Sequence, residues 1–227
     1  NSSDKTKQWL EELKEVAITT NKIWAEKLGI AQSVAITCVK PSGTVSQLVD
    51  SASGIHPRFS KQYIRRVRSD KKDPLAVFME DKGFPVEQDV MSPASAVFSF
   101  PVKAPEKSVT VAEVGAMQQL ELWKTYQNHW CEHKPSITVY YTDNEFLQVA
   151  QWIWDNFEIC SGISLLPVSD HVYQQAPYED ISIEKYNELL AAMPQDVSWE
   201  DLENFEQEDN TTGSQELACT GGACEIV

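Results

Sequence analysis

The sequence lacks two features that would direct the chain to a membrane. It has no apolar run that approaches the roughly 20 residues needed to cross a bilayer. It does not open on the apolar core of a signal peptide either, because residues 1–7 lead into a charged helical pattern. We therefore expect no membrane-spanning segment and no export.

Cations are also scarce. The 227 residues include 19 Lys and Arg against 34 Asp and Glu, for a formal net charge of -15. Proteins that bind the backbone of DNA or RNA need clustered Lys and Arg, so this balance argues against a nucleic acid partner. The acidic excess is concentrated after Pro177, where Lys185 is nearly the only cation.

Cysteine is present in an odd number, five, which does not suit a disulfide framework. Without an export signal, this favours a reducing cytoplasm. We expect Cys38, Cys131 and Cys160 to be small buried apolar residues. The composition, 42% hydrophobic and 23% charged, is ordinary for a globular domain or for part of a larger one.

Helical and strand patterns alternate over residues 6–167. Capping boxes at residues 110–113 and 142–145 mark two helix starts. Short connections between alternating helices and strands predict parallel strands with crossover helices, in an α/β layer or barrel. The Trp and Tyr residues are expected to pack in the core. The expected helices begin at residues 6, 73, 110 and 142, and the expected strands cover residues 34–39, 63–68, 96–102, 136–141 and 162–167.

A turn of small residues, 41–46, lies between the expected strand at 34–39 and a helix start at 47–49. Such a turn directs backbone N–H groups at one spot, which favours an anion. Gly43 allows a close approach, and hydroxyl side chains add donors. An ordinary capped turn is the alternative, because the spacing is not that of a Gly-rich P-loop. The candidate phosphate-binding residues are Pro41, Ser42, Gly43, Thr44, Val45 and Ser46.

The expected strand at 63–68 carries the densest positive charge, and Arg58 and Lys61 precede it. It would suit an electropositive wall for a polyphosphate. A solvated edge strand is the alternative, and it is the better interpretation unless residues 41–46 lie nearby.

The character of the chain changes at residue 176. Ser-capped helices are expected at 182–193 and 198–205, and the acidic stretch that follows has the composition of a disordered tail. The sequence therefore predicts three parts: an α/β domain over 1–175, a short helical extension over 176–205 and a flexible tail over 206–227.

The tail carries Cys219 and Cys224, with two glycines between them. A metal site needs about four ligands and finds only two here, so we predict none. A structural disulfide would close a tiny loop in a segment with nothing to stabilise. A redox dithiol fits better, because thiol–disulfide exchange needs a pair that can join and separate. From Phe205 to Cys219 the chain reaches roughly 45–50 Å extended and about 20 Å as a coil, which suits a shuttle.

These motifs together resemble the C-terminal portion of a class II, adenosylcobalamin-dependent ribonucleotide reductase. The resemblance is closest to the monomeric ribonucleoside-triphosphate reductase branch. It rests on residues 39–46, 53–56, 63–68, 130–140 and 161–167, and on the terminal Cys-x4-Cys.

The resemblance implies a ten-stranded α/β barrel that encloses the active site. Residues 41–46 would hold the phosphates of a ribonucleoside triphosphate. Cys219 and Cys224 would re-reduce an active-site disulfide and be recharged by thioredoxin. The family reaction replaces the ribose 2′-OH with hydrogen by means of a thiyl radical that adenosylcobalamin initiates.

One departure from the family pattern is serious. The Asn-x-Cys-x-Glu stretch that carries the thiyl cysteine is absent. We therefore expect a fragment that is inactive alone and needs the missing N-terminal part of the reductase. The rival hypotheses are a non-catalytic α/β module that binds a phosphate ligand and docks a thioredoxin-like partner, and a cysteine-tailed reductase of another cofactor class.

Overall fold

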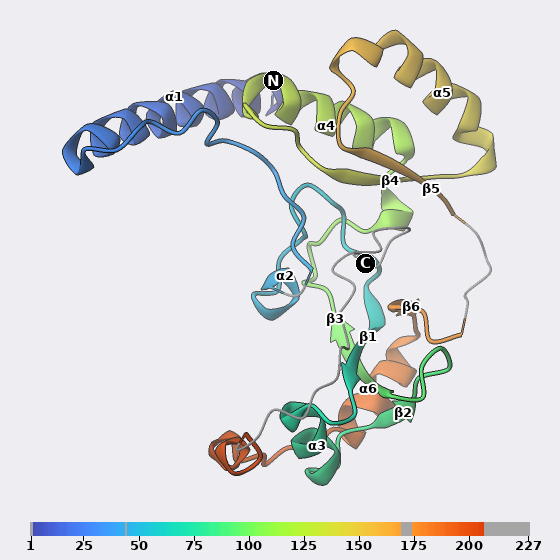
Figure 1. Ribbon diagram of the computed structural model, residues 1–227. Coiled ribbons are helices and arrows are strands. Elements are labelled where there is room, and N and C mark those ends of the chain that lie inside the picture. The colour runs from blue at the N-terminus through green and yellow to red at the C-terminus, as the bar shows by residue number, and fades with distance from the viewer. Residues whose placement is uncertain (1, 44, 169–173, 207–227) are drawn as a thin grey trace. The chain divides into compact units, whose positions relative to one another are not determined.

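The computed structural model describes residues 2–43, 45–168 and 174–206. They form a mixed α/β structure of two compact units, each assembled from two stretches of chain (Figure 1). Unit 1 comprises Asn1–Arg58 and Val109–Ser169, and unit 2 comprises Phe59–Ser108 and Asp170–Val227. The sequence-based division into 1–175, 176–205 and 206–227 follows changes in composition along the chain, whereas the two units follow contacts in space, so that division stays a prediction.

Unit 1 is built around two parallel strands, β4 (Ile137–Tyr141) and β5 (Ile163–Pro167), in which Ile137 lies opposite Ile163. The helix α5 (Phe146–Asp155) crosses over between them, as the sequence predicts. The other elements of unit 1 are α1 (Ser2–Leu28), α2 (Val45–Leu48), α4 (Ala116–His129) and the 3-10 turns η1 (Val111–Glu113), η2 (Asp143–Glu145) and η3 (Phe157–Ile159).

The core of unit 1 lies between α4, α5 and the two strands. Trp123 is fully buried, donates its indole N–H to Pro135 O at 2.9 Å and meets Trp152 edge to face. Both predicted capping boxes are present. Glu113 Oε2 accepts from Thr110 N and Glu145 Oε2 accepts from Thr142 N, each at 2.9 Å. Each box opens a 3-10 turn, and the α-helix begins after it.

The expected strand at 34–39 is wrong, because these residues run as irregular chain. Their backbone groups do not pair with a neighbouring strand among the described residues. Ile36 N and Thr37 N donate to Glu132 Oε2, and Thr37 O accepts from Glu132 N at 2.9 Å. The apolar pattern is therefore satisfied by a loop rather than by a sheet.

Unit 2 is built on a four-stranded sheet of order β2-β3-β1-β6, whose neighbouring strands all pair antiparallel. This differs from the expected run of parallel strands. The central strand β1 (Gln62–Asp70) has partners on both sides, so the edge-strand interpretation of residues 63–68 is wrong. The other strands are β2 (Val86–Gln88), β3 (Ser95–Lys103) and β6 (Tyr178–Asp180), and the helical elements are α3 (Pro74–Asp81), α6 (Ile183–Ala192) and η4 (Trp199–Asn204).

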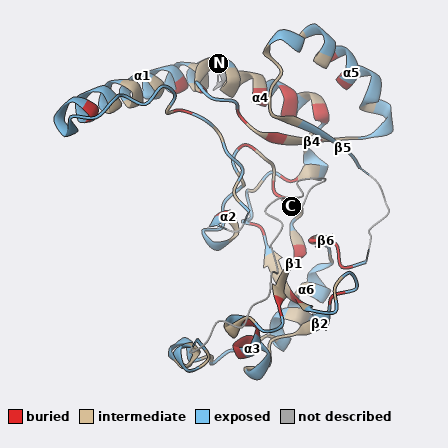
Figure 2. Ribbon diagram, in the orientation of Figure 1, coloured by how far each residue is buried: buried red, intermediate tan, exposed pale blue. Residues whose placement is uncertain are grey.

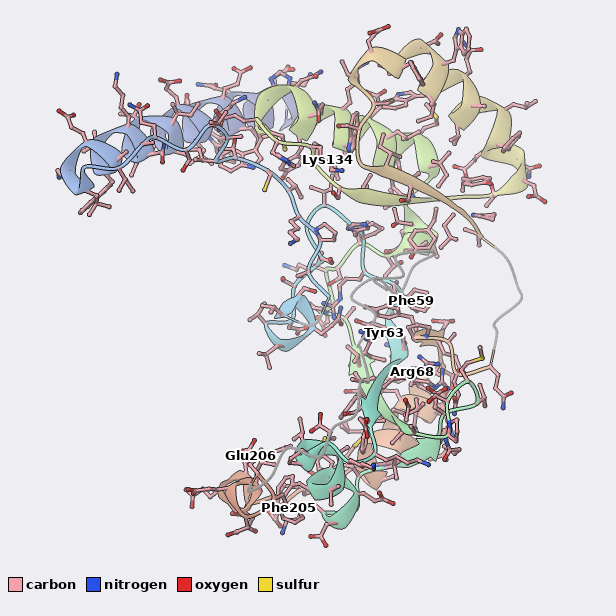
Figure 3. All side chains as sticks on the ribbon, viewed as in Figure 1. Phe59, Tyr63, Arg68, Lys134, Phe205 and Glu206 are labelled. Atoms are coloured by element: carbon pink, nitrogen blue, oxygen red, sulfur yellow. The ribbon has the colours of Figure 1, made fainter. Side chains whose placement is uncertain are left out.

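A second core fills unit 2 around the fully buried Phe78 of α3. Trp199 and Phe205 pack on its ring, each with centroids 5.4 Å apart, so the last described turn is anchored to this core. Figure 3 shows Phe205 beside α3. The expected helix over 198–205 is a 3-10 helix.

The sheets of the described residues are small, with two and four strands, and the expected ten-stranded barrel is not confirmed. The predicted disordered tail, 206–227, lies outside the described residues from residue 207 onward. Within the described part of the chain, no helix combines the length and the apolar character that a membrane span requires.

Candidate functional site

The predicted phosphate-binding segment lies in unit 1, immediately before and within the short helix α2. Its described residues are 41–43, 45 and 46, whereas Thr44 lies outside them. Ser46 is buried and donates its hydroxyl to Ser42 O at 3.5 Å. Gly43 faces open space, because an added Cβ would meet no atom within 4 Å.

The hydroxyl of Ser53 holds the start of this segment. It accepts from Ser42 N and donates to Ser42 O, both at 2.8 Å. Gly54 has φ +60, and a Cβ there would lie 3.1 Å from Val39 Cγ1 and 3.4 Å from Lys40 O. Glycine is therefore required at 54, because both the positive φ and the close approach exclude a side chain.

His56 connects the same loop to the sheet. Its Nε2 accepts from the backbone N–H of Thr138 at 2.8 Å, so Nδ1 carries the proton and donates to Ser53 O at 2.6 Å. Burial lowers the pKa of His56, against a smaller raising effect of the Ser53 hydrogen bond. The ring is a neutral structural bridge and not a charged anion ligand.

Arg58 also supports the loop from within. Its side chain is 3% exposed, forms an ion pair with Asp50 Oδ1 at 3.3 Å and donates to Ser51 O. The arginines of β1 belong to unit 2, where Arg66 pairs with Glu179, Arg68 with Asp89, and Arg65 lies over the Tyr178 ring. Because these charges have partners of their own, the geometry weakens the electropositive-wall interpretation.

The segment 130–136 supports the chain that leads into the loop. Glu132 accepts from the backbone of Ile36 and from Thr37, and these hydrogen bonds, the one from Ile36 first, lower the pKa of its carboxyl group. The Trp130 indole donates to Cys38 O at 3.0 Å, and Ser136 N donates to Val39 O at 3.0 Å.

The motif segment 161–167 contacts the segment 130–136 at Gly162. This residue has φ +63, and an added Cβ would lie 2.8 Å from Pro135 O. The motif segments therefore lie in one unit and contact one another in sequence-distant pairs, such as residues 36–39 with 130–136. These segments are 39–46, 53–56, 130–140 and 161–167. The roles of Ser53, His56 and Glu132 could not be assigned from spacing. Their only signal was membership in the motifs.

The described cysteines differ in their surroundings. Cys131 is buried as expected, and burial raises the pKa of its thiol to about 11. Cys160 is half-buried, and its thiol pKa is also raised by burial. Cys38 is exposed, so its expected burial is wrong. Cys219 and Cys224 lie outside the described residues. Within the described part, no three His, Cys, Asp or Glu residues gather as a metal site would require.

No family model matches the chain, whereas individual proteins do. It is 29% identical over 227 residues to a reductase of Lactobacillus acidophilus and 30% identical over 217 residues to one of Lactobacillus helveticus. These matches cover 96% and 92% of the chain. The crystal structure of a B12-dependent, class II ribonucleotide reductase superimposes with a TM-score of 0.73 at 25% identity, over 89% of this chain.

The fold and the converging motifs thus correspond to a part of a class II ribonucleotide reductase, and the resemblance inferred from the motifs is confirmed. The relatives from Lactobacillus acidophilus, Lactobacillus helveticus and Lactobacillus leichmannii all carry the name adenosylcobalamin-dependent ribonucleoside-triphosphate reductase. The chain spans about 30% of the length of these relatives.

Proposed function

We propose that the chain is a functional part of an adenosylcobalamin-dependent ribonucleoside-triphosphate reductase, an oxidoreductase that makes deoxyribonucleotides in the cytoplasm. The observation that carries this proposal is the linkage of four motif segments in unit 1: Ser53 holds Ser42, the segment 130–140 holds His56 and residues 36–39, and Gly162 lies against Pro135. The complete enzyme would include the missing N-terminal part and would form the ten-stranded barrel, to which β4 and β5 would contribute two strands.

The loop formed by Pro41, Ser42, Gly43, Thr44, Val45 and Ser46 would hold the substrate phosphates. Three features support this role: small side chains, open space beside Gly43 and a scaffold that presents the loop from 53–56 and 130–136. Backbone N–H groups and hydroxyls are neutral donors, and they bind phosphate oxygens without a cluster of positive charges.

Adenosylcobalamin would bind to the complete enzyme. The described residues gather no group of three His, Cys, Asp or Glu that could hold a metal ion. We therefore assign no cofactor contact and no radical step to this chain.

Cys219 and Cys224 would carry electrons. A tail thiolate attacks the active-site disulfide to give a mixed disulfide, and the second tail thiol then displaces the active-site sulfur. The exchange converts the active-site disulfide into two thiols and the tail dithiol into a disulfide. The dithiol of thioredoxin then reduces the tail disulfide. The packing of Phe205 on Phe78 would fix the root from which this tail extends.

The proposal is tested by joining this chain to the remainder of the reductase and assaying reduction of a ribonucleoside triphosphate. We expect no activity from the chain alone and activity from the complete enzyme. Gly43→Val should raise KM for the substrate and leave cobalamin homolysis intact, because the added side chain would occupy the open side of the loop. An unchanged KM would remove the phosphate assignment.

A second test isolates the tail. In the complete enzyme, Cys219→Ser should prevent multiple turnovers with thioredoxin as reductant and leave a single turnover without it. Multiple turnovers in that variant would contradict the shuttle.

A further inference from the structure

An exposed apolar stripe runs along α1, and unit 1 offers nothing within its described residues that covers it. Figure 2 shows most of the helix in the colour of exposed residues, with intermediate and buried residues between them. At 3.6 residues per turn, the members of the stripe fall within an arc of about 100°. Its residues, with their exposed fractions, are Trp9 53%, Leu13 57%, Val16 62%, Ile23 46% and Trp24 54%.

The side of α1 that is buried lies elsewhere around the axis. Leu10 and Ala25 are 9% and 4% exposed, and their positions fall about 90° and about 150° from the centre of the stripe. The helix therefore packs with a small, partly polar side and leaves its most apolar side open. The side chains of Trp9, Leu13 and Val16, together with Glu12, also form a shallow hollow.

We propose that this α1 stripe is a docking face for the part of a class II reductase that the chain does not span. The inference rests on the proposed function, and it names the surface through which the two parts would meet. About 70% of the length of the relatives lies outside the match, so a large partner of the right kind is implied.

The charges of α1 argue against a membrane as the occupant. Lysines and acidic residues are interspersed along the helix, and Lys5 and Lys27 lie over the rings of Trp9 and Trp24 within the stripe, whereas a helix that lies on a membrane has a strongly basic polar face. The exposed parts of the five stripe residues sum to on the order of 500 Å², less than the roughly 800 Å² per partner of a stable interface, so the partner must also cover other open surface of unit 1. A second copy of this chain is the alternative occupant, and the labelling experiment below distinguishes it.

The parallel sheet of the same unit points in the same direction. Parallel strands normally occur with both faces covered by other elements. On β5, Leu165 is 44% and Leu166 37% exposed, and on α5 Trp154 is 79% exposed. Unit 1 therefore has open apolar surface on its sheet as well as on α1, as expected for a piece of a larger layer.

The test uses the whole chain and the part of the Lactobacillus helveticus reductase that it does not match, expressed as a separate polypeptide. We expect a complex, and we expect Leu13→Glu to weaken it at least tenfold. Glu15→Gln is the matched control, because Glu15 is exposed on α1 away from the stripe. The Glu15→Gln chain should bind the reductase part with unchanged affinity.

Maleimide labelling then locates the face. Val16→Cys and Glu15→Cys should react equally in the free chain, and the complex should slow labelling at residue 16 at least tenfold and leave residue 15 unchanged. Absence of a complex, equal labelling of both sites in the complex, or protection of residue 16 by dimers of the free chain would each overturn the proposal.

The outcome for docking is separable from that for function. A protected stripe in a complex that does not reduce ribonucleoside triphosphates would leave the docking face and remove the proposed activity. An active complex in which the stripe stays accessible to maleimide would support the proposed activity and remove the docking face.

Discussion

The two units differ in how completely the strands of their sheets and their apolar side chains are covered. In unit 2, β1 is flanked on both sides, its arginines have partners, and Phe78 is covered by the rings of Trp199 and Phe205. In unit 1, only two parallel strands are present among the described residues, and apolar side chains on α1, α5 and β5 stay exposed. Unit 2 resembles a self-contained layer, whereas unit 1 resembles a section cut from one, and unit 1 holds the candidate phosphate loop.

The largest expected effect tests whether unit 1 nevertheless has a real core. Trp123→Ala should destabilise unit 1 by about 3–5 kcal/mol, because it removes a fully buried indole and its bond to Pro135 O. Hydrogen exchange measured unit by unit should show faster exchange in unit 1 only. Trp154→Ala, at a residue 79% exposed, is the matched control and should have little effect. Equal effects of both variants would mean that the core does not hold unit 1 together.

The next effect concerns the close approach of Gly162 to Pro135, which joins the motif segments 161–167 and 130–140. Gly162→Ala should cost about 2–3 kcal/mol in unit 1, because it combines a positive φ with a Cβ only 2.8 Å from Pro135 O. Gly83→Ala in unit 2 separates these causes, since Gly83 has φ +80 but nothing within 4 Å of an added Cβ. It should cost only about 1 kcal/mol. Urea denaturation measures both, and similar losses would show that backbone strain alone matters.

A smaller effect is pH dependence confined to unit 1. Burial lowers the pKa of His56 below 6.5, the ordinary value for histidine, so as the pH falls the unfolded chain takes up a proton before the folded unit does. The stabilisation by the neutral ring is present above pH 6.5 and is lost as the pH falls below it. The urea midpoint should therefore decrease from pH 7.5 to pH 5.5.

His56→Gln should flatten that pH dependence, whereas His133→Gln, at an exposed residue, should leave the slope unchanged. A slope that is the same in the wild type and in His56→Gln would assign the pH dependence to other groups.

The smallest effect is expected at an exposed ion pair of unit 2. Lys185 and Glu188 lie 2.9 Å apart, three residues apart on α6, and both side chains are largely exposed. Lys185→Ala should change stability by at most about 0.5 kcal/mol, because water screens such pairs. A change in the thermal midpoint well beyond that would show that charges contribute more to unit 2 than its packing suggests.

Local patterns predicted the helices well, because caps and periodicity act within a few residues. Thr142 and Glu145 mark the turn that leads into α5, and the structure has that capping box. The strand expected at 34–39 failed for the opposite reason. Its backbone partner is Glu132, almost a hundred residues away, and no local pattern shows that a carboxylate will take the place of a neighbouring strand.

The candidate site was only partly accessible from the sequence. Small residues at 41–46 indicated a loop suited to an anion, and the resemblance gave it a substrate. The supporting contacts of Ser53 and His56 depend on a chain reversal at Gly54 that brings 53–56 against residues 39–42. Such a reversal is a tertiary event, and spacing alone does not reveal it.

The double hydrogen bond between Ser53 and Ser42 has a thermodynamic consequence for any ligand of the loop. A phosphate oxygen that binds Ser42 N must displace the Ser53 hydroxyl, so the gain is the difference between two acceptors rather than a whole new bond. The released hydroxyl can then donate to the same phosphate. Ligand binding at residue 42 is thus an exchange of partners, coupled through the Ser53 backbone to His56 and through His56 to β4.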